Sequence, residues 1–441
     1  MKESDERAIL VGLELRGRTG SLAAGKAESF RYSSEESLEE LAALAESAGA
    51  AVVEHVIQSR PAPEAATLIG SGKVRELAQL TGASQADVVI FDRDLSPTQQ
   101  RNLERALSVK VVDRTQLILD IFARRARTRE GQLQVELAQL SYLLPRLVGR
   151  GVEMSRLGGG IGTRGPGETQ LETDRRRIAR RLKKIRVELE SVRGHRSVQR
   201  KQRQAIPLAT AALVGYTNAG KSTLFNRLTG AGVLADDRLF ATLDPTIRAA
   251  ILPSRRRILL SDTVGFIRNL PTTLIDAFRA TLEEVIEASL LIHVVDASSA
   301  HAVHQTSHVR KVLTEIGIAN TPQVLVLNKA DSLPAGGIDR ETVHRRLAED
   351  LGAIVQARAV SISALTGAGI ERLLEAIDET LPLDPVERVH FRLPAGEGAA
   401  LHLLHEFGQV RAADYADGYC NVEADVPESI RRRLTRYLVE S

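Results

Sequence analysis

The stretch Gly215-Tyr216-Thr217-Asn218-Ala219-Gly220-Lys221-Ser222-Thr223 decides the fold, because an apolar run precedes it and a segment with helical spacing follows it. A strand, a glycine-rich loop and a helix form the context in which a G-x-x-x-x-G-K-[ST] match predicts a phosphate-binding loop. Its backbone N–H groups can point at one anion, and the helix N-terminus adds a favourable dipole. Lys221 would reach the β- and γ-phosphates and Ser222 would ligate Mg²⁺. The alternative is an ordinary strand-to-helix turn.

A second motif, Asp262-Thr263-Val264-Gly265, follows a predicted strand about 40 residues beyond this loop. Alone, D-x-x-G recurs by chance in many proteins. At this distance from a phosphate loop it predicts a carboxylate near Mg²⁺ and a backbone amide, that of Gly265, facing the γ-phosphate.

A third motif, Asn328-Lys329-Ala330-Asp331, ends the predicted strand that begins at Val324. The Asp331 carboxylate only accepts hydrogen bonds, so it can take both the ring N–H and the exocyclic amine of guanine, whereas adenine presents an acceptor at the first position. Ser363-Ala364-Leu365 follows the next strand, where backbone amides could meet the guanine carbonyl. The sequence therefore predicts a guanine-nucleotide site, against the alternative of a charged turn.

Length and composition place these motifs in a larger protein. The 441 residues suggest about three domains of roughly 150 residues, and 43% apolar residues can supply their cores. No window approaches the ~18 consecutive apolar residues of a membrane span, and the first seven residues are too charged for a signal peptide. We expect a cytoplasmic protein without stable membrane insertion. The single cysteine, Cys420, excludes an intramolecular disulfide.

The fold class expected is α/β, with four parts. Alternating strand-like and helix-like stretches predict an N-terminal α/β subdomain with a largely parallel sheet over residues 1–115. Within it, Ser34 is the expected cap of a helix, and Gly70-Ser71-Gly72-Lys73 is better explained as a turn than as a second phosphate loop. The nucleotide-binding domain spans 205–383. Residues 384–441, with a strand, a helix, two strands and a helix, form a small α+β domain.

Leucines recur at heptad spacing in two segments of residues 116–204, which predicts an antiparallel helical hairpin with breaks at Pro145 and Gly194. A glycine-rich tip loop, 150–170, joins the two helices. From Arg129 to Arg203 there are 18 Lys and Arg against 8 Asp and Glu, a local net charge of +10 in a chain whose total is +3. This favours contact with nucleic acid over a merely solvated face, and the scarcity of aromatic residues favours the backbone of folded RNA.

The order of these motifs, with Phe240-Ala241-Thr242-Leu243-Asp244 and the glycine-rich segment, resembles the HflX family of translation-factor-class GTPases. The resemblance covers nearly the whole chain and is least distinctive beyond Asp384. It implies a GTP-hydrolysing, monomeric factor that binds the large ribosomal subunit and its rRNA and splits ribosomes stalled by stress. It also implies that Thr242 completes the Mg²⁺ site, whereas spacing alone leaves Thr242 and Thr246 open. Lys221, Thr242 and Gly265 are thus the expected catalytic residues, and Ser222 and Thr242 the expected metal ligands.

Two positions bear on the mechanism. Phe266 stands where a water-orienting glutamine would, so unassisted hydrolysis should be slow, and we expect the large subunit to stimulate it. Asn218 resembles the loop asparagine of GTPases activated by K⁺, which leaves a K⁺ requirement open. Two alternatives to ribosome splitting remain, a GTPase that assists large-subunit assembly and a nucleotide-regulated RNA-binding or remodelling protein.

Overall fold

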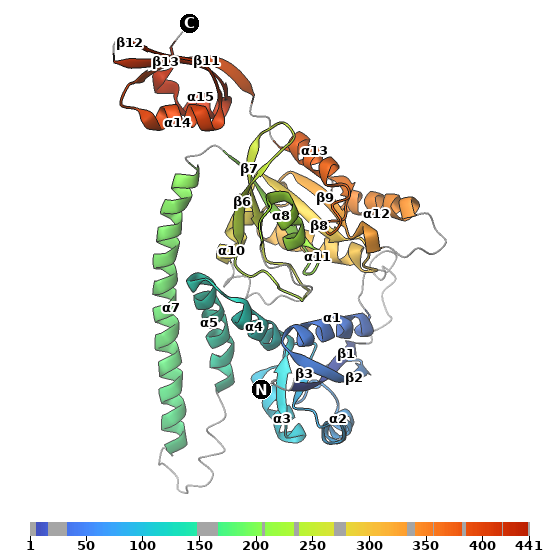
Figure 1. Ribbon diagram of the computed structural model, residues 1–441. Helices are drawn as coiled ribbons and strands as arrows, with labels where there is room; N and C mark the ends of the chain where they lie inside the picture. The colour runs from blue at the N-terminus through green and yellow to red at the C-terminus, as the bar shows by residue number, and fades with distance from the viewer. Residues whose placement is uncertain are drawn as a thin grey trace.

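The computed structural model describes residues 6–15, 33–147, 166–204, 208–232, 238–268, 279–332, 340–355, 357–381, 385–416 and 418–439. Most of the predicted tip loop, including Arg150, Arg156 and Arg164, lies outside these ranges. In Figure 1 the N-terminal and C-terminal domains lie at opposite ends of the molecule, with the nucleotide-binding domain between them. No helix within these ranges is both long enough and apolar enough to cross a bilayer.

The N-terminal domain has the predicted parallel sheet, in the order β2-β1-β3-β4. Its elements are β1 (Glu6–Leu15), α1 (Ser34–Ser47), β2 (Ala50–Arg60), α2 (Ser71–Ser84), β3 (Val88–Phe91), α3 (Pro97–Leu107) and β4 (Lys110–Asp113). The predicted cap at Ser34 is wrong by one residue. Ser33 caps α1, because its hydroxyl accepts from the Glu36 amide while the Glu36 carboxylate accepts from the Ser33 amide. As predicted, Gly70 precedes a helix, α2, as its N-cap.

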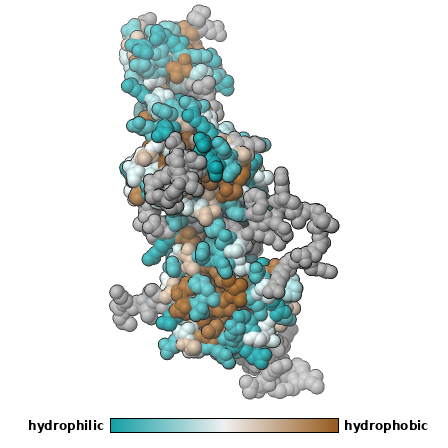
Figure 2. Space-filling model, turned by 90° about the vertical axis from the view of Figure 1, so that its right-hand side faces the viewer, coloured by the Kyte–Doolittle hydropathy of each residue, from teal (hydrophilic) through white to brown (hydrophobic). Residues whose placement is uncertain are grey.

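Helix α4 (Arg114–Arg125) follows directly and belongs to the core of this domain. Ile118, Ile121 and Phe122 on it are almost fully buried and pack in the same cluster as Leu41 of α1. The domain boundary expected at residue 115 therefore falls inside a helix. Figure 2 shows a mostly hydrophilic face, with a hydrophobic patch over this N-terminal domain.

The helical hairpin consists of α5 (Arg129–Leu143) and α7 (Pro166–Gln204). The two helices run antiparallel (Figure 1), and the ion pairs Arg129–Glu188 and Arg181–Glu136 fix their register. Leucines of α5 pack on Ile185 and Leu189 in a small cluster of their own. The heptad spacing therefore predicted the contact correctly.

The two expected breaks in the hairpin have different outcomes. α5 ends at Leu143 and gives way to a single 3-10 turn, Leu144–Leu147, which contains Pro145. The break expected at Gly194 is wrong, because α7 continues through it to Gln204. A lone glycine costs a helix only about 1 kcal/mol relative to alanine, which is too little to break a helix of 39 residues.

The nucleotide-binding domain has a six-stranded sheet in the order β10-β9-β8-β5-β7-β6, with only β6 antiparallel. Its strands are β5 (Ala209–Gly215), β6 (Thr246–Ile251), β7 (Arg257–Asp262), β8 (Leu290–Asp296), β9 (Gln323–Asn328) and β10 (Arg358–Ser361). Its helices are α8 (Lys221–Thr229), α10 (Arg279–Ile286), α11 (Ala302–Glu315), α12 (Arg340–Val355) and α13 (Ile370–Thr380). α8 and α13 pack in one core cluster, and α10 and α11 pack in another.

The C-terminal domain has the predicted α+β order. It comprises β11 (Val386–Pro394), α14 (Gly398–Phe407), β12 (Gln409–Ala416), β13 (Tyr419–Pro427) and α15 (Glu428–Arg433) in a three-stranded antiparallel sheet. Cys420 is a buried core residue of this domain.

One core cluster joins the N-terminal domain to the nucleotide-binding domain. Leu239, Phe240, Phe266 and Ile267 are buried together with residues of α1 and α4. These four residues flank the Thr242 and Gly265 positions singled out in the sequence. The N-terminal domain therefore packs on the segments expected to sense the γ-phosphate.

Candidate nucleotide-binding site

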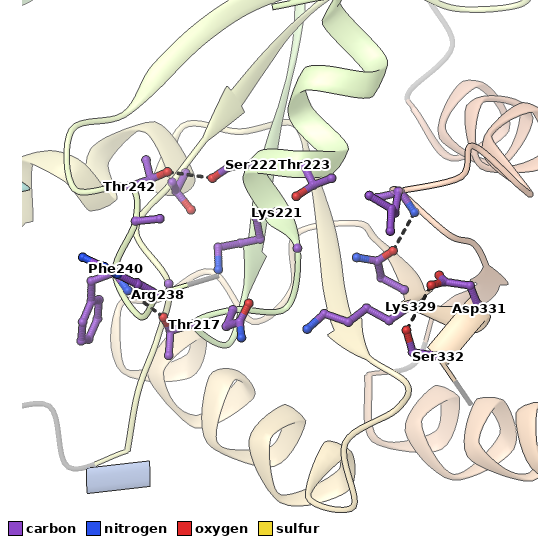
Figure 3. Close-up of a pocket in the computed structure, with 18 residues that line it drawn as sticks. Thr217, Lys221, Ser222, Thr223, Arg238, Phe240, Thr242, Lys329, Asp331 and Ser332 are labelled. Atoms are coloured by element: carbon purple, nitrogen blue, oxygen red, sulfur yellow. Dashed lines mark hydrogen bonds between the residues drawn. The ribbon is translucent and has the colours of Figure 1, made fainter. Parts of the chain in front are cut away.

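A cavity of about 560 Å³ opens at the carboxyl ends of the parallel strands, where ligands of open α/β sheets bind. Figure 3 shows Lys221 in its centre, with Thr217 and Phe240 on one side and Lys329, Asp331 and Ser332 on the other. The predicted residues that line it are Thr217, Asn218, Gly220, Lys221, Ser222, Thr223, Phe240, Ala241, Thr242, Thr263, Gly265, Asn328, Lys329, Asp331, Ala364 and Leu365. All the predicted motifs thus contribute to one cavity.

The phosphate loop has the backbone that its sequence demands. Gly220 has φ +91°, and a Cβ there would lie 2.2 Å from the Asn328 side-chain nitrogen. Asn218 also has a positive φ, 58°, which asparagine tolerates better than most residues. The loop therefore turns tightly into α8, whose first residue is Lys221.

Lys221 is buried and donates to the carbonyl oxygens of Gly215, at 3.2 Å, and Tyr216, at 2.8 Å. Burial lowers its pKa from 10.5 to about 8. A phosphate oxygen beside the amine would favour the ammonium form and raise that pKa. The site is therefore arranged so that a bound anion stabilises the charged lysine.

Three oxygen-bearing side chains meet beside the phosphate loop. The Ser222 and Thr242 hydroxyl oxygens lie 2.7 Å apart, and both donate to Oδ2 of Asp262, at 2.7 and 3.0 Å. Among the described residues, the buried Oδ1 of Asp262 has no hydrogen-bond partner. Burial also raises the pKa of Asp262, which a nearby cation would lower.

This set fits Mg²⁺, a hard cation that takes oxygen ligands. Ser222 and Thr242 would hold the ion, and the Asp262 carboxylate would balance its charge from behind. Bound there, Mg²⁺ would neutralise charge on the β- and γ-phosphates. The geometry brings Thr242, rather than Thr246, to Ser222.

Gly265 approaches the phosphate loop closely. A Cβ at this position would lie 2.7 Å from Thr217 Cα and 2.9 Å from Lys221 Nζ. The next residue, Phe266, is bound by its backbone to the loop, since its N–H donates to Gly215 O and its carbonyl accepts from Thr217 N. Its ring is buried in the interdomain core, so this position offers no polar group to the cavity.

The residues predicted to read the base lie at the opposite end of the cavity. Asn328 donates to Ala219 O and accepts from Ala364 N, both at 2.9 Å, which ties the base loop to the phosphate loop. A hydrogen bond from Ser363 holds the pKa of the Asp331 carboxyl below its usual value, so it is an ionised acceptor. Asp331 is therefore ready to accept two N–H groups.

Several predicted residues lie outside the cavity lining. Asp244 is the clearest departure, because its carboxylate accepts from the backbone N–H groups of Arg127 and Thr128, at 2.8 and 2.9 Å, and from the Thr128 hydroxyl. It fixes the start of α5, which Thr128 caps. The predicted residues that do not line the cavity are Gly215, Tyr216, Ala219, Leu243, Asp244, Asp262, Val264, Ala330 and Ser363.

Three residues that the sequence analysis missed also belong to the site. Arg238 and Ser332 line the cavity, and Asp296, at the end of β8, pairs with Lys329 at 2.8 Å. Asp296 could have been found from its place at the carboxyl end of a predicted strand. Arg227 of α8 further supports the base loop, since it donates to the carbonyl oxygens of Ala364 and Leu365.

The parallel sheet, the phosphate loop, the D-x-x-G segment and the base-reading loop define a P-loop GTPase. Three successive regions of the chain each match a protein family, described as "GTP-binding GTPase N-terminal" at residues 35–123, "GTP-binding GTPase Middle Region" at 125–203 and "50S ribosome-binding GTPase" at 210–329.

Curated relatives align over nearly the full length. The chain is 48% identical to GTPase HflX of Caldanaerobacter subterraneus over 92% of this chain and 91% of the relative. It is 45% identical to GTPase HflX of Escherichia coli K12 over 91% of this chain and 92% of that relative. A solved structure of a GTP-binding protein from Sulfolobus solfataricus in complex with GDP is 27% identical over 85% of this chain and 98% of that chain, with a TM-score of 0.42. The chain belongs to the HflX family of GTPases, which are GTP-hydrolysing enzymes.

Proposed function

We propose that this protein binds the large ribosomal subunit in the cytoplasm and uses GTP to split stalled ribosomes under stress. The family match supports a ribosomal partner, and the basic hairpin supports contact with rRNA. On α7 the exposed cations, which only partly pair with acids, are Arg175, Arg176, Arg177, Arg180, Lys183, Lys184 and Arg186. Such a row of cations would bind RNA phosphates.

One observation carries the proposal, the link between the nucleotide site and the hairpin. Thr242 bonds to Ser222 in the metal site, while Asp244, two residues on, holds the N-terminus of α5. If hydrolysis releases Thr242, the hydrogen bonds of Asp244 are strained or lost. A change at the γ-phosphate would therefore alter how the hairpin is held.

The predicted slow hydrolysis has a physical basis in the same site. Phe266 offers no group to orient water, so we propose that the large subunit reorders the switches or supplies the missing group. Mg²⁺ would be bound by Ser222 and Thr242, and K⁺ at Asn218 remains an alternative source of charge. The protein would act as a monomer.

Sucrose gradients test the proposal. Intact ribosomes incubated with the protein and GTP should yield free subunits, and deletion of residues 158–167 should abolish splitting while GDP binding persists. Splitting that survives this deletion would exclude the tip as the effector. Co-migration with precursor particles, without splitting, would instead favour the role in large-subunit assembly. Binding to RNA without release of subunits would favour a nucleotide-regulated RNA-binding protein.

A further inference from the structure

Arg238 is a cation in the nucleotide cavity that none of the sequence motifs includes. It lines the cavity together with Thr217, Lys221 and Gly265. Figure 3 shows it on the same side as Phe240 and Thr217, across the cavity from Asp331. Arg238 therefore lies at the end that receives phosphates, away from the base.

The residues after Arg238 are anchored from two directions. The Leu239 N–H donates to Ser47 Oγ of α1 at 3.0 Å, and the Phe240 N–H donates to Thr217 Oγ1 at 3.0 Å. The Phe240 ring packs edge-on against Phe122 of α4, with ring centroids 4.6 Å apart. Because Leu239 and Phe240 are buried, the chain that directly follows Arg238 is held at the rim of the cavity.

Other charged groups of the described lining have different tasks. Lys221 is the lysine of the phosphate loop, and Lys329 is paired with Asp296. Phe266 cannot donate a hydrogen bond. Arg238 is the third cation of the described lining, and its place at the phosphate end of the cavity puts it near the charge that develops on the γ-phosphate.

We propose that Arg238 is a catalytic residue, an arginine finger supplied by the chain itself. In hydrolysis a water oxygen forms a bond to the γ-phosphorus, and the bond from that phosphorus to the oxygen of the leaving GDP breaks. The protons of the water pass to inorganic phosphate and solvent. The Arg238 guanidinium is unchanged and donates hydrogen bonds to phosphate oxygens as their charge shifts toward GDP.

This role also explains the contact between the N-terminal domain and the switch. Ser47 and Phe122 hold the segment that carries Arg238, so the N-terminal domain sets the position of the finger. It further implies that K⁺ is not needed for the intrinsic reaction, because an arginine and a K⁺ supply the same charge.

Single-turnover GTP hydrolysis tests the proposal in the full-length protein without ribosomes, so its failure is separable from a failure of ribosome splitting. Arg238→Ala should slow hydrolysis at least about tenfold, toward the ~10³-fold loss found when such arginines are removed elsewhere. Affinities for GDP and GTPγS should change less than about threefold, since the contact is strongest in the transition state. Arg238→Lys keeps the positive charge but loses the planar guanidinium, so its hydrolysis rate should lie between those of the unmodified protein and Arg238→Ala.

Arg248→Ala is the matched control, because Arg248 is an exposed arginine of the nearby strand β6 that bonds to its own strand at Ile247 O. Its rate should equal that of the unmodified protein. An unchanged rate in Arg238→Ala would overturn the proposal. A loss of GDP affinity as large as the loss of rate would also overturn it, since that would make Arg238 a binding residue. A wild-type rate that is high in KCl and low in NaCl would assign the charge to a cation at Asn218 instead.

Discussion

Replacing Arg114 by methionine should destabilise the N-terminal domain where it packs on the nucleotide-binding domain. Arg114 is 1% exposed and donates to Asp92 at 2.8 Å, to Glu40, and to the carbonyl oxygen of Arg268 at 3.3 Å. Glu40 also accepts from the Tyr216 hydroxyl at 3.1 Å, so the cluster reaches the phosphate loop. Arg114 is therefore the most buried cation of this cluster, and Arg268 also lies near both carboxylates, 3.9 Å from Glu40 and 3.8 Å from Asp92.

The magnitude follows from what the substitution leaves behind. Methionine fills much of the volume of Arg114 but compensates neither Asp92 nor Glu40, whose side chains are 11% and 12% exposed. Removing one partner of a buried ion pair costs about 3–5 kcal/mol, most of it from the stranded charge. Arg268 still lies within 4 Å of both carboxylates, so we expect Arg114→Met to lower the free energy of unfolding of the N-terminal domain by about 3 kcal/mol, the lower end of that range.

Urea unfolding followed by circular dichroism measures this loss, with Arg75→Met as the matched control. Arg75 is an exposed residue of α2, and its loss should cost less than about 0.5 kcal/mol. An Arg114→Met protein as stable as the Arg75→Met control would refute this account of the interface.

Three further predictions concern the nucleotide-binding domain. The pKa of Lys221 is about 8, so its neutral form accumulates as the pH rises, and GDP affinity should fall about tenfold between pH 7 and 9. Titration with fluorescent GDP measures this fall. An equal pH dependence of GDP affinity in Lys221→Ala would contradict the prediction. Burial lowers the pKa of His293 from 6.5 to about 4. Below pH 6.5 the unfolded chain therefore binds a proton that the folded protein does not, and the free energy of unfolding should fall by about 3 kcal/mol as the pH falls to 4. Urea unfolding should show this loss, and His293→Gln should remove it. Gly265→Ala introduces a Cβ 2.7 Å from Thr217 Cα and should weaken GTPγS binding by about 1–3 kcal/mol, with less effect on GDP binding. Equal effects on both nucleotides would place Gly265 away from the γ-phosphate.

The sequence could indicate which segments line the cavity, because the predicted site residues lie in contiguous motifs. The loop at Lys221 and the base-reading segment at Asp331 each combine a fixed pattern with a strand, and neighbouring parallel strands bring such segments to one edge. Arg238 has no such pattern, and it lines the cavity only because Leu239 and Phe240 pack against a distant domain. Tertiary contacts of this kind leave no local signal.

The same limit applies to Asp244 and to the helices. Asp244 lies within a recognisable motif, yet its carboxylate accepts a hydrogen bond from the backbone of Thr128, the N-cap of α5, which lies 116 residues away along the chain. Helix α4 was not separated from the hairpin, because an amphipathic helix does not reveal which core it joins. Gly194 shows the reverse error, since a weak local preference for a break was outweighed by its helical neighbours.

Direct titration of nucleotides into purified protein tests the central claim, that a guanine nucleotide is held between the loop of Lys221 and the carboxylate of Asp331. The unmodified protein should bind GDP far more tightly than ADP. Asp331→Asn should lose affinity for GDP and gain it for XDP, because the amide can donate to the carbonyl that replaces the exocyclic amine. Equal affinity of the unmodified protein for GDP and ADP would contradict the account.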